Sequence, residues 1–344
     1  MAQILVTGAA GFIGAHVAAA LARAGHRVVG CDSFNAYYPV ELKIARVAAL
    51  PAPAGVAVER LDLCDGQALQ ALMQRHRIDT VLHLAAQAGV RHSVSAPLDY
   101  VQANLLGFAS VLEACRLQGV GHLLYASSSS VYGRRDGEGA PAGFRESDRT
   151  DAPASFYAAT KQANEAMAHA TAAVHGLPVT GLRFFTVYGP WGRPDMAYWG
   201  FAERLRRGET LQLYGRGELR RDFTHVDDVV DALLRLVARG APAGGHREDG
   251  VPAELFNIGH RHPVRVLDFV RLLERATGCP AHIEFAPMQA GDVPDTSADP
   301  SRLIAAIGPW RATPLAEGLA GFVRWLDDWR AGRSASRPVL TVAA

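Results

Sequence analysis

The stretch QILVTGAAGFIG at residues 3–14 decides the fold class of this chain. A short apolar run suited to a β-strand leads into three glycines, Gly8, Gly11 and Gly14, where a helical pattern begins. The first glycine permits a tight turn, the second lets backbone approach a pyrophosphate, and the third lets helix and strand pack closely. The phosphates then face the positive end of the helix. Three glycines can also occupy an ordinary strand-to-helix turn, but their place after the first strand predicts dinucleotide binding.

The alternation that begins with this stretch continues through the first half of the chain. Apolar runs of strand type are separated by helical patterns, which implies a parallel sheet covered on both faces. The expected strands read QILVTG, RVVGCD, VAVERLDL, DTVLHLAA, HLLYASSS and VTGLRFF, and the expected helices span 12–24, 66–76, 97–118 and 157–175. We therefore predict an α/β protein with a Rossmann-type, doubly wound parallel sheet whose ligand binds at the carboxyl ends of the strands.

The second half is less regular, with helical patterns at 226–239, 264–277 and 314–330. We expect three parts along the chain, two of which are folded domains. They are a dinucleotide-binding domain over 1–180, to which 222–240 and 254–260 return, a smaller α/β substrate-binding lobe mainly over 181–330, and a loose tail over 331–344.

The composition is that of an ordinary soluble globular protein, with 49% hydrophobic and 20% charged residues and a net charge of +1. Nothing in this balance favours nucleic acid or a membrane surface as a partner. Four separated cysteines without a C-x-x-C pair predict free structural thiols and a cytoplasmic location. His260 and His262 have no third ligand at a recognisable spacing, so we expect no metal site.

Asp32 ends the second expected strand, 24 residues after Gly8. A carboxylate there can accept both hydroxyls of an adenosine ribose and would repel a 2′-phosphate, which favours NAD over NADP as cofactor. The alternative for Asp32 is an ordinary turn residue at a strand end. Further cofactor contacts are expected at Phe12, Ile13, Asn35, Asp62, Leu63, Leu84, Ala85, Ala86 and Asn104.

Tyr157 and Lys161 form a Y-x-x-x-K pattern that places both side chains on one face of a helix. A tyrosine with its usual pKa of about 10 needs cationic neighbours to act as a base near neutrality. Lowering that pKa by about 3 units takes about 4 kcal/mol of selective phenolate stabilisation, which the ammonium and the nicotinamide ring of NAD could supply. The alternative is an amphipathic helix that carries the pair by chance.

The stretch YASSSSVYG at residues 125–133 ends the fifth expected strand in four serines, which could also be a simple turn. Together with the glycine turn and the Tyr/Lys pair it resembles the extended short-chain dehydrogenase/reductase superfamily of nucleotide-sugar enzymes, over nearly the whole chain. The resemblance implies that Ser128 is catalytic with Tyr157 and Lys161. It also implies that Ser129 and Ser130 line the sugar pocket.

The serine run also lacks a carboxylate that related enzymes carry. Relatives that dehydrate a sugar have Thr-Asp-Glu at this place, and UDP-glucuronate decarboxylases have Thr-Ser-Glu, whereas this chain has Ser128, Ser129 and Ser130. No acid or base is then ready to act at C5 and C6 of the sugar. Oxidation and re-reduction at one carbon, which is epimerisation, is the reaction left.

Longer stretches resemble UDP-glucuronate 4-epimerases in particular. They are DSFNAYYPVELKIAR, LAAQAGVRHS, SFYAATKQANE, GLRFFTVYGPWGRPDMA, RRDFTHVDDVVDAL and PMQAGDVPDTSAD. The resemblance implies NAD-dependent C4 epimerisation of UDP-glucuronate to UDP-galacturonate through a transient 4-keto intermediate. It also implies that Thr186 lies near the UDP diphosphate, that Arg221 binds it, and that Asp292 contacts the uridine ribose. Gln87 and Arg91 complete the expected substrate contacts.

Arg193 is the candidate for holding the hexuronate carboxylate, because a guanidinium can bind a carboxylate through two hydrogen bonds. Each arginine alone could be a solvated surface charge, but Arg183, Arg193 and Arg221 are expected to gather in one lobe of a near-neutral protein. Gln289 stands where many other sugar epimerases have arginine, which makes diphosphate contacts there less certain.

Three alternatives to this function stay open. They are a C4 epimerase of a neutral UDP-hexose such as UDP-glucose or UDP-galactose, a UDP-glucuronate decarboxylase, and a non-catalytic dinucleotide-binding protein. The last would be expected to lack the Tyr/Lys pair, which this chain retains. By analogy with the superfamily, we expect a homodimer formed through helices 97–118 and 157–175.

Overall fold

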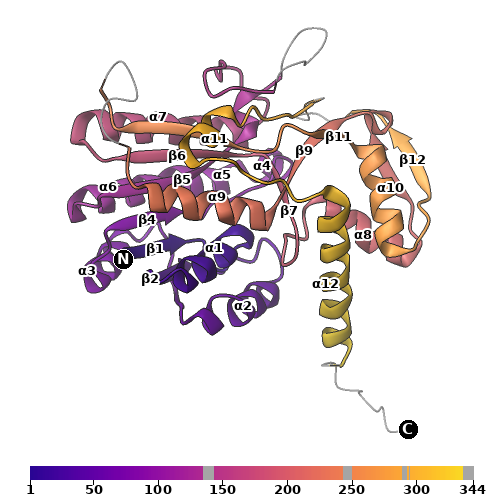
Figure 1. The fold of residues 1–344 in the computed structure, drawn as a ribbon, viewed down its shortest axis with the longest axis horizontal. Coiled ribbons are helices and arrows are strands. Elements are labelled where there is room, and N and C mark those ends of the chain that lie inside the picture. Colours follow the sequence, from indigo (N-terminus) through magenta and orange to yellow (C-terminus); the bar gives the residue numbers. More distant parts are fainter. Residues whose placement is uncertain (135–142, 243–249, 289–292, 294, 336–344) are drawn as a thin grey trace.

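The structure is a computed structural model, and it describes residues 1–134, 143–242, 250–288, 293 and 295–335 (Figure 1). Two groups of elements are visible, a large sheet with its helices and a smaller lobe that carries α8, α10 and α12. Within these residues no helix combines the length and the apolar character needed to cross a membrane. The expected contacts at Gln289 and Asp292 lie outside the described residues.

A seven-stranded parallel sheet forms the centre of the first group, in the order β10-β6-β5-β4-β1-β2-β3. Its strands are β1 (Gln3–Thr7), β2 (Arg27–Asp32), β3 (Ala57–Arg60), β4 (Thr80–His83), β5 (His122–Ser128), β6 (Val179–Phe184) and β10 (Ala253–Ile258). From β1 the chain adds β2 and β3 toward one edge of the sheet, and it then returns to the other side of β1 and adds β4, β5 and β6 toward the opposite edge. The predicted Rossmann-type, doubly wound fold is confirmed.

Helices cover both faces of this sheet. Successive side chains of β1 point to opposite faces, so each face contributes to its own core. Ile4 and Val6 point into one core with α1 (Phe12–Arg23) and α9 (Val226–Arg239). Leu5 points into the opposite core, where α3 (Gly66–His76), α6 (Gly107–Gln118) and α7 (Phe156–His175) pack.

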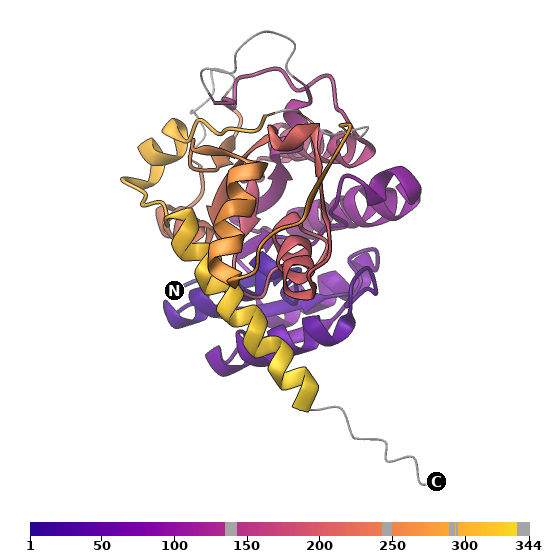
Figure 2. The same ribbon diagram turned by 90° about the vertical axis from the view of Figure 1, so that its right-hand side faces the viewer.

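The smaller lobe has its own sheets and core. A three-stranded sheet has the order β11-β9-β7 and a two-stranded sheet pairs β12 with β8. The strands are β7 (Thr186–Tyr188), β8 (Leu211–Tyr214), β9 (Arg220–His225), β11 (Pro263–Arg265) and β12 (Ile283–Ala286). Aromatic side chains such as Trp199, Phe269 and Phe322 fill its core between α8 (Ala197–Arg207), α10 (Val266–Thr277) and α12 (Leu315–Ala335). Helices α10 and α12 lie side by side in both views (Figures 1 and 2).

The chain order and the spatial order differ in the second half. Helix α9 packs against α1, and β10 forms the sheet edge beside β6, so both belong in space to the first group. Helix α12 continues to Ala335, past the residue at which the sequence pattern ended.

Several elements were not expected from the sequence. The expected helix at 97–118 is divided into α5 (Pro97–Tyr100), the π-helical η2 (Val101–Leu106) and α6. The others are α2 (Val40–Ala49), α4 (His92–Ser95), α11 (Ser301–Ile307), η1 (Ala52–Ala54), η3 (Ser129–Tyr132) and η4 (Gly215–Gly217). Helix α2 matters most here, because it reaches the functional site.

Candidate active site

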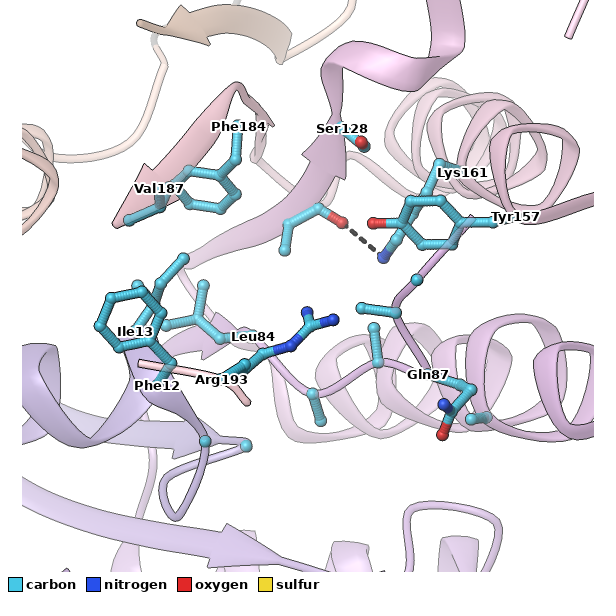
Figure 3. A pocket seen from close by; sticks show the side chains of 18 of the residues that line it. Phe12, Ile13, Leu84, Gln87, Ser128, Tyr157, Lys161, Phe184, Val187 and Arg193 are labelled. Carbon is cyan, nitrogen blue, oxygen red and sulfur yellow. Dashed lines mark hydrogen bonds between the residues drawn. The ribbon is translucent and has the colours of Figure 1, made fainter. Parts of the chain in front are cut away.

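A cavity of about 440 Å³ lies at the carboxyl ends of β1, β2, β4 and β5, where the smaller lobe meets the large sheet (Figure 3). Most of the residues predicted from the sequence line it. They are Gly8, Gly11, Phe12, Ile13, Gly14, Asp32, Asn35, Asp62, Leu63, Leu84, Ala85, Ala86, Gln87, Ser128, Ser129, Ser130, Tyr157, Lys161, Thr186, Arg193 and Arg221. The structure therefore brings the expected cofactor and substrate residues to one place.

Two of the predicted residues do not line the cavity. Asn104 is buried behind its wall, where its side chain accepts from the Gln87 N–H (2.8 Å) and donates to the Gln87 carbonyl (3.0 Å) and Thr160 Oγ1 (3.0 Å). It thereby holds the segment that follows β4. Arg91 is exposed and stacks its guanidinium over the Tyr214 ring of the smaller lobe, 5.2 Å from the ring centre.

The glycine turn is shaped so that backbone alone faces the cavity. Gly8 has φ of +70°, and a Cβ there would lie 2.7 Å from the Ala85 nitrogen. A Cβ on Gly14 would collide with the Gly8 carbonyl oxygen, and one on Gly11 would lie 2.8 Å from it. No side chain fits, which leaves a cradle at the start of α1 that fits the diphosphate of a dinucleotide.

Asp32 fixes the shape of this cradle while it lines the cavity. Its Oδ2 accepts from the Ala10 N–H of the glycine turn (3.1 Å), and its Oδ1 accepts from the Phe34 N–H (2.8 Å). Each carboxylate oxygen has a second lone pair, so the same group can still accept hydroxyls of a ribose.

Tyr157 and Lys161 extend from one face of α7 toward the end of β5 (Figure 3). The Lys161 ammonium donates to the Ala126 carbonyl (2.8 Å). Burial lowers the pKa of Lys161 to about 8, against the influence of Glu165. Burial also raises the pKa of Tyr157, opposed by a hydrogen bond with Ser128 and by the charge of Arg193. The protein groups alone therefore do not bring this phenol to the pKa of a base.

Within the serine stretch, Ser128 and Ser130 bond each other, whereas Ser127 bonds helix α7. Ser128 ends β5 and its Oγ lies 2.5 Å from Ser130 Oγ and accepts from the Ser130 N–H (3.2 Å). The Ser127 hydroxyl donates instead to Glu165 of α7 (2.5 Å). Ser128 and Ser130 thus present a linked pair of hydroxyls to the cavity.

The arginines expected to gather at the ligand take different places. Arg193 lines the cavity, where its Nε and Nη2 donate to Asp195 at 3.0 and 2.5 Å, and Figure 3 shows its guanidinium pointing inward. Arg183 is buried in β6 and donates twice to Glu165, at 2.9 and 2.7 Å. The prediction that Arg183 gathers with Arg193 and Arg221 in one lobe is wrong, because Arg183 lies in β6 of the large sheet, where Glu165 neutralises its charge.

Sequence reasoning missed three residues from α2 and the loop before it. Tyr37 donates to Asp195 (3.2 Å), Lys43 donates to Asn35 (2.7 Å), and the fully buried Arg46 donates to backbone carbonyls of the glycine turn and of residues 191 and 192. The signal was present as an amphipathic pattern at residues 40–49 with a lysine and an arginine three positions apart.

The acidic groups around the cavity are unevenly placed. Among the described residues that line it, the carboxylates are Asp32 and Asp62, both on the side of the glycine turn, and none lies beside the serines. Within the same described part of the chain, no group of three or more His, Cys, Asp or Glu side chains could hold a metal ion.

Comparison with known proteins agrees with this geometry. The model of the NAD dependent epimerase/dehydratase family matches residues 4–259. UDP-glucuronate 4-epimerase 1 of Arabidopsis thaliana is 44% identical over 331 residues, or 94% of this chain and 76% of the relative. UDP-glucuronate 4-epimerase 4 of the same plant is 43% identical over 337 residues, with 96% and 76% covered. A crystal structure of UDP-glucuronic acid 4-epimerase from Bacillus cereus, in complex with UDP-glucuronic acid and NAD, matches with TM-score 0.85 at 31% identity and covers 95% of this chain and 99% of that chain.

Proposed function

The chain belongs to the NAD dependent epimerase/dehydratase family, and from that membership we propose that it converts UDP-glucuronate to UDP-galacturonate by C4 epimerisation. The observation that carries the proposal is the pairing of Tyr157 and Lys161 with a wall of serine hydroxyls that has no carboxylate among its described residues. Such a site can move a proton at one sugar oxygen, but it has no acid or base for elimination at the neighbouring carbons.

NAD, once bound, supplies a reversible hydride acceptor and a positive nicotinamide ring that lowers the pKa of a nearby phenol. The residues that would hold it are the glycine turn for the diphosphate and Asp32 for the adenosine ribose. We assign the second ribose to Lys161. Burial raises the pKa of Tyr157 in the protein alone, so the proposed mechanism relies on the positive nicotinamide ring to lower it.

With NAD bound as hydride acceptor, Tyr157 would remove the proton of the C4 hydroxyl while the C4 hydride leaves to that acceptor, and Ser128 would hydrogen-bond the same oxygen. The 4-keto sugar formed by this two-electron oxidation would turn about its diphosphate link and present its other face. The same hydride would then return to C4 as Tyr157 gives its proton back to the C4 oxygen, which yields the epimer and restores NAD. Ser129 and Ser130 offer hydroxyls that can bond the sugar in either orientation.

The 4-keto acid formed in this way is a β-keto acid and could lose carbon dioxide. We assign the substrate carboxylate to Arg193, whose guanidinium lines the cavity and donates to Asp195, and this contact would keep the carboxylate out of line with the carbonyl π system. Glu165, which accepts from Ser127, does not line the cavity, and no described residue brings a carboxylate into the cavity beside the serines. Together with the contact of Arg193, this favours epimerisation over decarboxylation.

A second candidate has one observation in its favour. Because Arg193 is already paired with Asp195, its charge does not require a substrate carboxylate, and a neutral UDP-hexose could occupy the site. Both sugars must therefore be compared directly.

The test is incubation of the protein with NAD and either UDP-glucuronate or UDP-glucose, followed by separation and identification of the products. We expect UDP-galacturonate from the first sugar, and Tyr157→Phe should abolish its formation while NAD still binds. UDP-galactose formed at the higher rate would establish the second candidate, and a UDP-pentose would establish a decarboxylase. NAD binding without any product would leave a binding protein.

We also propose that the protein is a homodimer. Apolar side chains on the two helical segments expected to pair are exposed, including Leu98 (76%) in α5, Leu106 (50%) in η2 and Val174 (75%) in α7. The variants Leu98→Glu and Val174→Glu should each be monomeric by light scattering, whereas the unaltered protein should be a dimer.

The free, buried thiols of Cys31 and Cys115 support a reducing, cytoplasmic location, which localisation of the tagged protein would test.

A further inference from the structure

The chain is almost devoid of lysine. Of its 35 lysine and arginine residues, only Lys43 and Lys161 are lysine, and all other basic positions carry arginine. Both lysines are buried, at 5% and 1% exposure, and both line the same cavity. An ammonium is a compact donor that fits where a planar guanidinium does not. Lys161 has a part in the proposed chemistry, and Lys43 is the other lysine in the same cavity.

Lys43 lies in α2, at the side of the cavity that carries the glycine turn. Its ammonium donates to Asn35 Oδ1 (2.7 Å) and lies 4.7 Å above the centre of the Tyr38 ring. Over the described residues no carboxylate oxygen comes within 4.0 Å of it, so no ion pair neutralises the charge. Burial lowers the pKa of Lys43, the charge of Asp32 opposes that shift, and the charges of Arg46 and Arg193 add to it.

The hydrogen bonds around Lys43 leave a second donor open. An ammonium can only donate, so it fixes the Asn35 amide with its oxygen toward Lys43 and its nitrogen toward Gln87 Oε1, 3.5 Å away. The Gln87 Nε2 is then buried without a partner, although Gln87 lines the cavity at 5% exposure. A buried donor without an acceptor is costly unless a ligand supplies one.

Lys43 and the glycine turn line the same cavity, and helix α2 contacts that turn through Arg46. Asp32 accepts from the Ala10 N–H of the glycine turn, and Arg46, one helical turn after Lys43, donates to the Ala10 carbonyl (2.5 Å). The glycine turn itself offers only N–H groups and the partial charge of the helix end. A dinucleotide brings two full negative charges to this place, and an unpaired ammonium can meet them.

We propose that Lys43 is the cation that binds the diphosphate of the cofactor, with Asn35 and Gln87 as the amides that position it. This inference rests on the proposed NAD-dependent function. It adds a charged contact from an element that the sequence motifs for dinucleotide binding do not include. The alternatives are a purely structural lysine and a cation that receives the 2′-phosphate of NADP.

The test separates the diphosphate from the rest of the ligand. Calorimetric titrations would measure the binding of ADP-ribose, adenosine, NAD and NADP to protein freed of nucleotide, for the unaltered chain, Lys43→Met and Arg27→Met. The last removes an exposed positive charge at the start of β2 and controls for net charge. We expect Lys43→Met to weaken ADP-ribose and NAD by about 10- to 100-fold, to leave adenosine within about twofold, and Arg27→Met to change neither.

An equal loss for adenosine and ADP-ribose, or no loss for either, would overturn the proposal in favour of a structural lysine. A loss confined to NADP would assign Lys43 to the 2′-phosphate. Because these titrations involve no sugar turnover, the proposed epimerase activity can fail while the Lys43 assignment holds, and the reverse is equally visible.

A second measurement needs no variant. With only two lysines, reductive methylation followed by peptide mass spectrometry reports on each ammonium separately. ADP-ribose should protect Lys43, whereas adenosine should not. Equal labelling of Lys43 with and without ADP-ribose would contradict the proposal even if Lys43→Met failed to fold.

Discussion

Two arginine–carboxylate pairs in this molecule have nearly the same geometry and opposite uses. Arg183 donates to Glu165 at 2.9 and 2.7 Å, and Arg193 donates to Asp195 at 3.0 and 2.5 Å. The side chains of the first pair are 3% and 11% exposed, those of the second 21% and 24%. The first pair joins β6 to α7 inside the fold, while the second joins residues two positions apart at the cavity wall.

The difference shows that the surroundings of an ion pair, rather than its hydrogen bonds, decide its role. Glu165 also accepts from Ser127, so the buried pair fixes α7 against β5 and thereby sets Tyr157 opposite Ser128. Loss of one buried partner leaves an uncompensated charge, whereas loss of one partly exposed partner is compensated by solvent. The Arg183–Glu165 pair therefore has a structural role. In the second pair, Arg193 can leave Asp195 and bind a carboxylate of the ligand instead.

The largest expected effect is on the buried pair. Arg183→Met should lower the free energy of unfolding by about 3–5 kcal/mol, because it leaves Glu165 charged in the core. Denaturant unfolding of the nucleotide-free protein measures this loss. The double variant Arg183→Met/Glu165→Met removes both charges and should recover much of it. If Arg183→Met were as stable as the unaltered protein, the buried pair would contribute as little to stability as the partly exposed pair.

The next effect falls on the pair in the cavity and concerns turnover. Arg193→Ala should slow epimerisation of UDP-glucuronate by about 30- to 800-fold, from the loss of about 2–4 kcal/mol of charge-assisted bonding. Any UDP-glucose activity should change far less, and unfolding by less than about 1 kcal/mol. The ratio of UDP-pentose to UDP-galacturonate should rise, since the carboxylate is freed. If both turnover and product ratio are unchanged, the carboxylate site lies among the serines and Thr186.

Lys161 extends the comparison to a buried cation that donates to a backbone carbonyl and forms no ion pair among the described residues. Since burial lowers its pKa from 10.5 to about 8, the unfolded chain binds more protons between these values. The nucleotide-free protein should therefore gain stability from this group as pH rises from about 8 to 10.5, and carry the full penalty below pH 8. Lys161→Met should remove that slope and stabilise the protein at pH 7 by about 1–3 kcal/mol, while it impairs NAD binding and turnover. An unchanged slope in unfolding measurements over this range would show that the ammonium is adequately solvated.

The smallest effect is expected from the partner of Arg193. Asp195→Asn keeps the shape of the side chain but frees the guanidinium, so the preference for UDP-glucuronate over UDP-glucose should rise by about two- to fivefold, or about 0.5–1 kcal/mol. The ratio of kcat/KM values for the two sugars measures this preference. A fall in the ratio would mean that Asp195 positions Arg193 rather than competing with the substrate.

The sequence predicted the parts of this molecule that rest on local pattern. The glycines after the first strand and the alternation of strands and helices determine the fold, and the Y-x-x-x-K spacing places Tyr157 and Lys161 correctly on one face of α7. The expected grouping of Arg183 with Arg193 and Arg221 was wrong because nothing in the local sequence shows that an arginine will form an ion pair inside the core. Its partner Glu165 lies 18 positions earlier on another element.

Helix α2 was missed for a related reason. The amphipathic pattern at residues 40–49 indicates a helix, but it does not show that Arg46 contacts carbonyls of residues 10, 191 and 192 and so brings the helix to the site. The division of the expected helix at 97–118 also escaped prediction, since the π-helical η2 keeps an apolar pattern close to that of an α-helix.

The position of β10 at the sheet edge has a consequence for synthesis on the ribosome. All six residues of β6 are buried in the finished protein, and β10, which covers its edge, follows about 70 residues later in the chain. At about 5–20 residues per second, the nascent chain carries an apolar strand with an open edge for roughly 4–14 s. Unpaired strands of this kind are templates for association with other chains. The interval between the synthesis of these two strands is therefore a period in which a translating chain is exposed to aggregation and in which a holding chaperone would improve its yield.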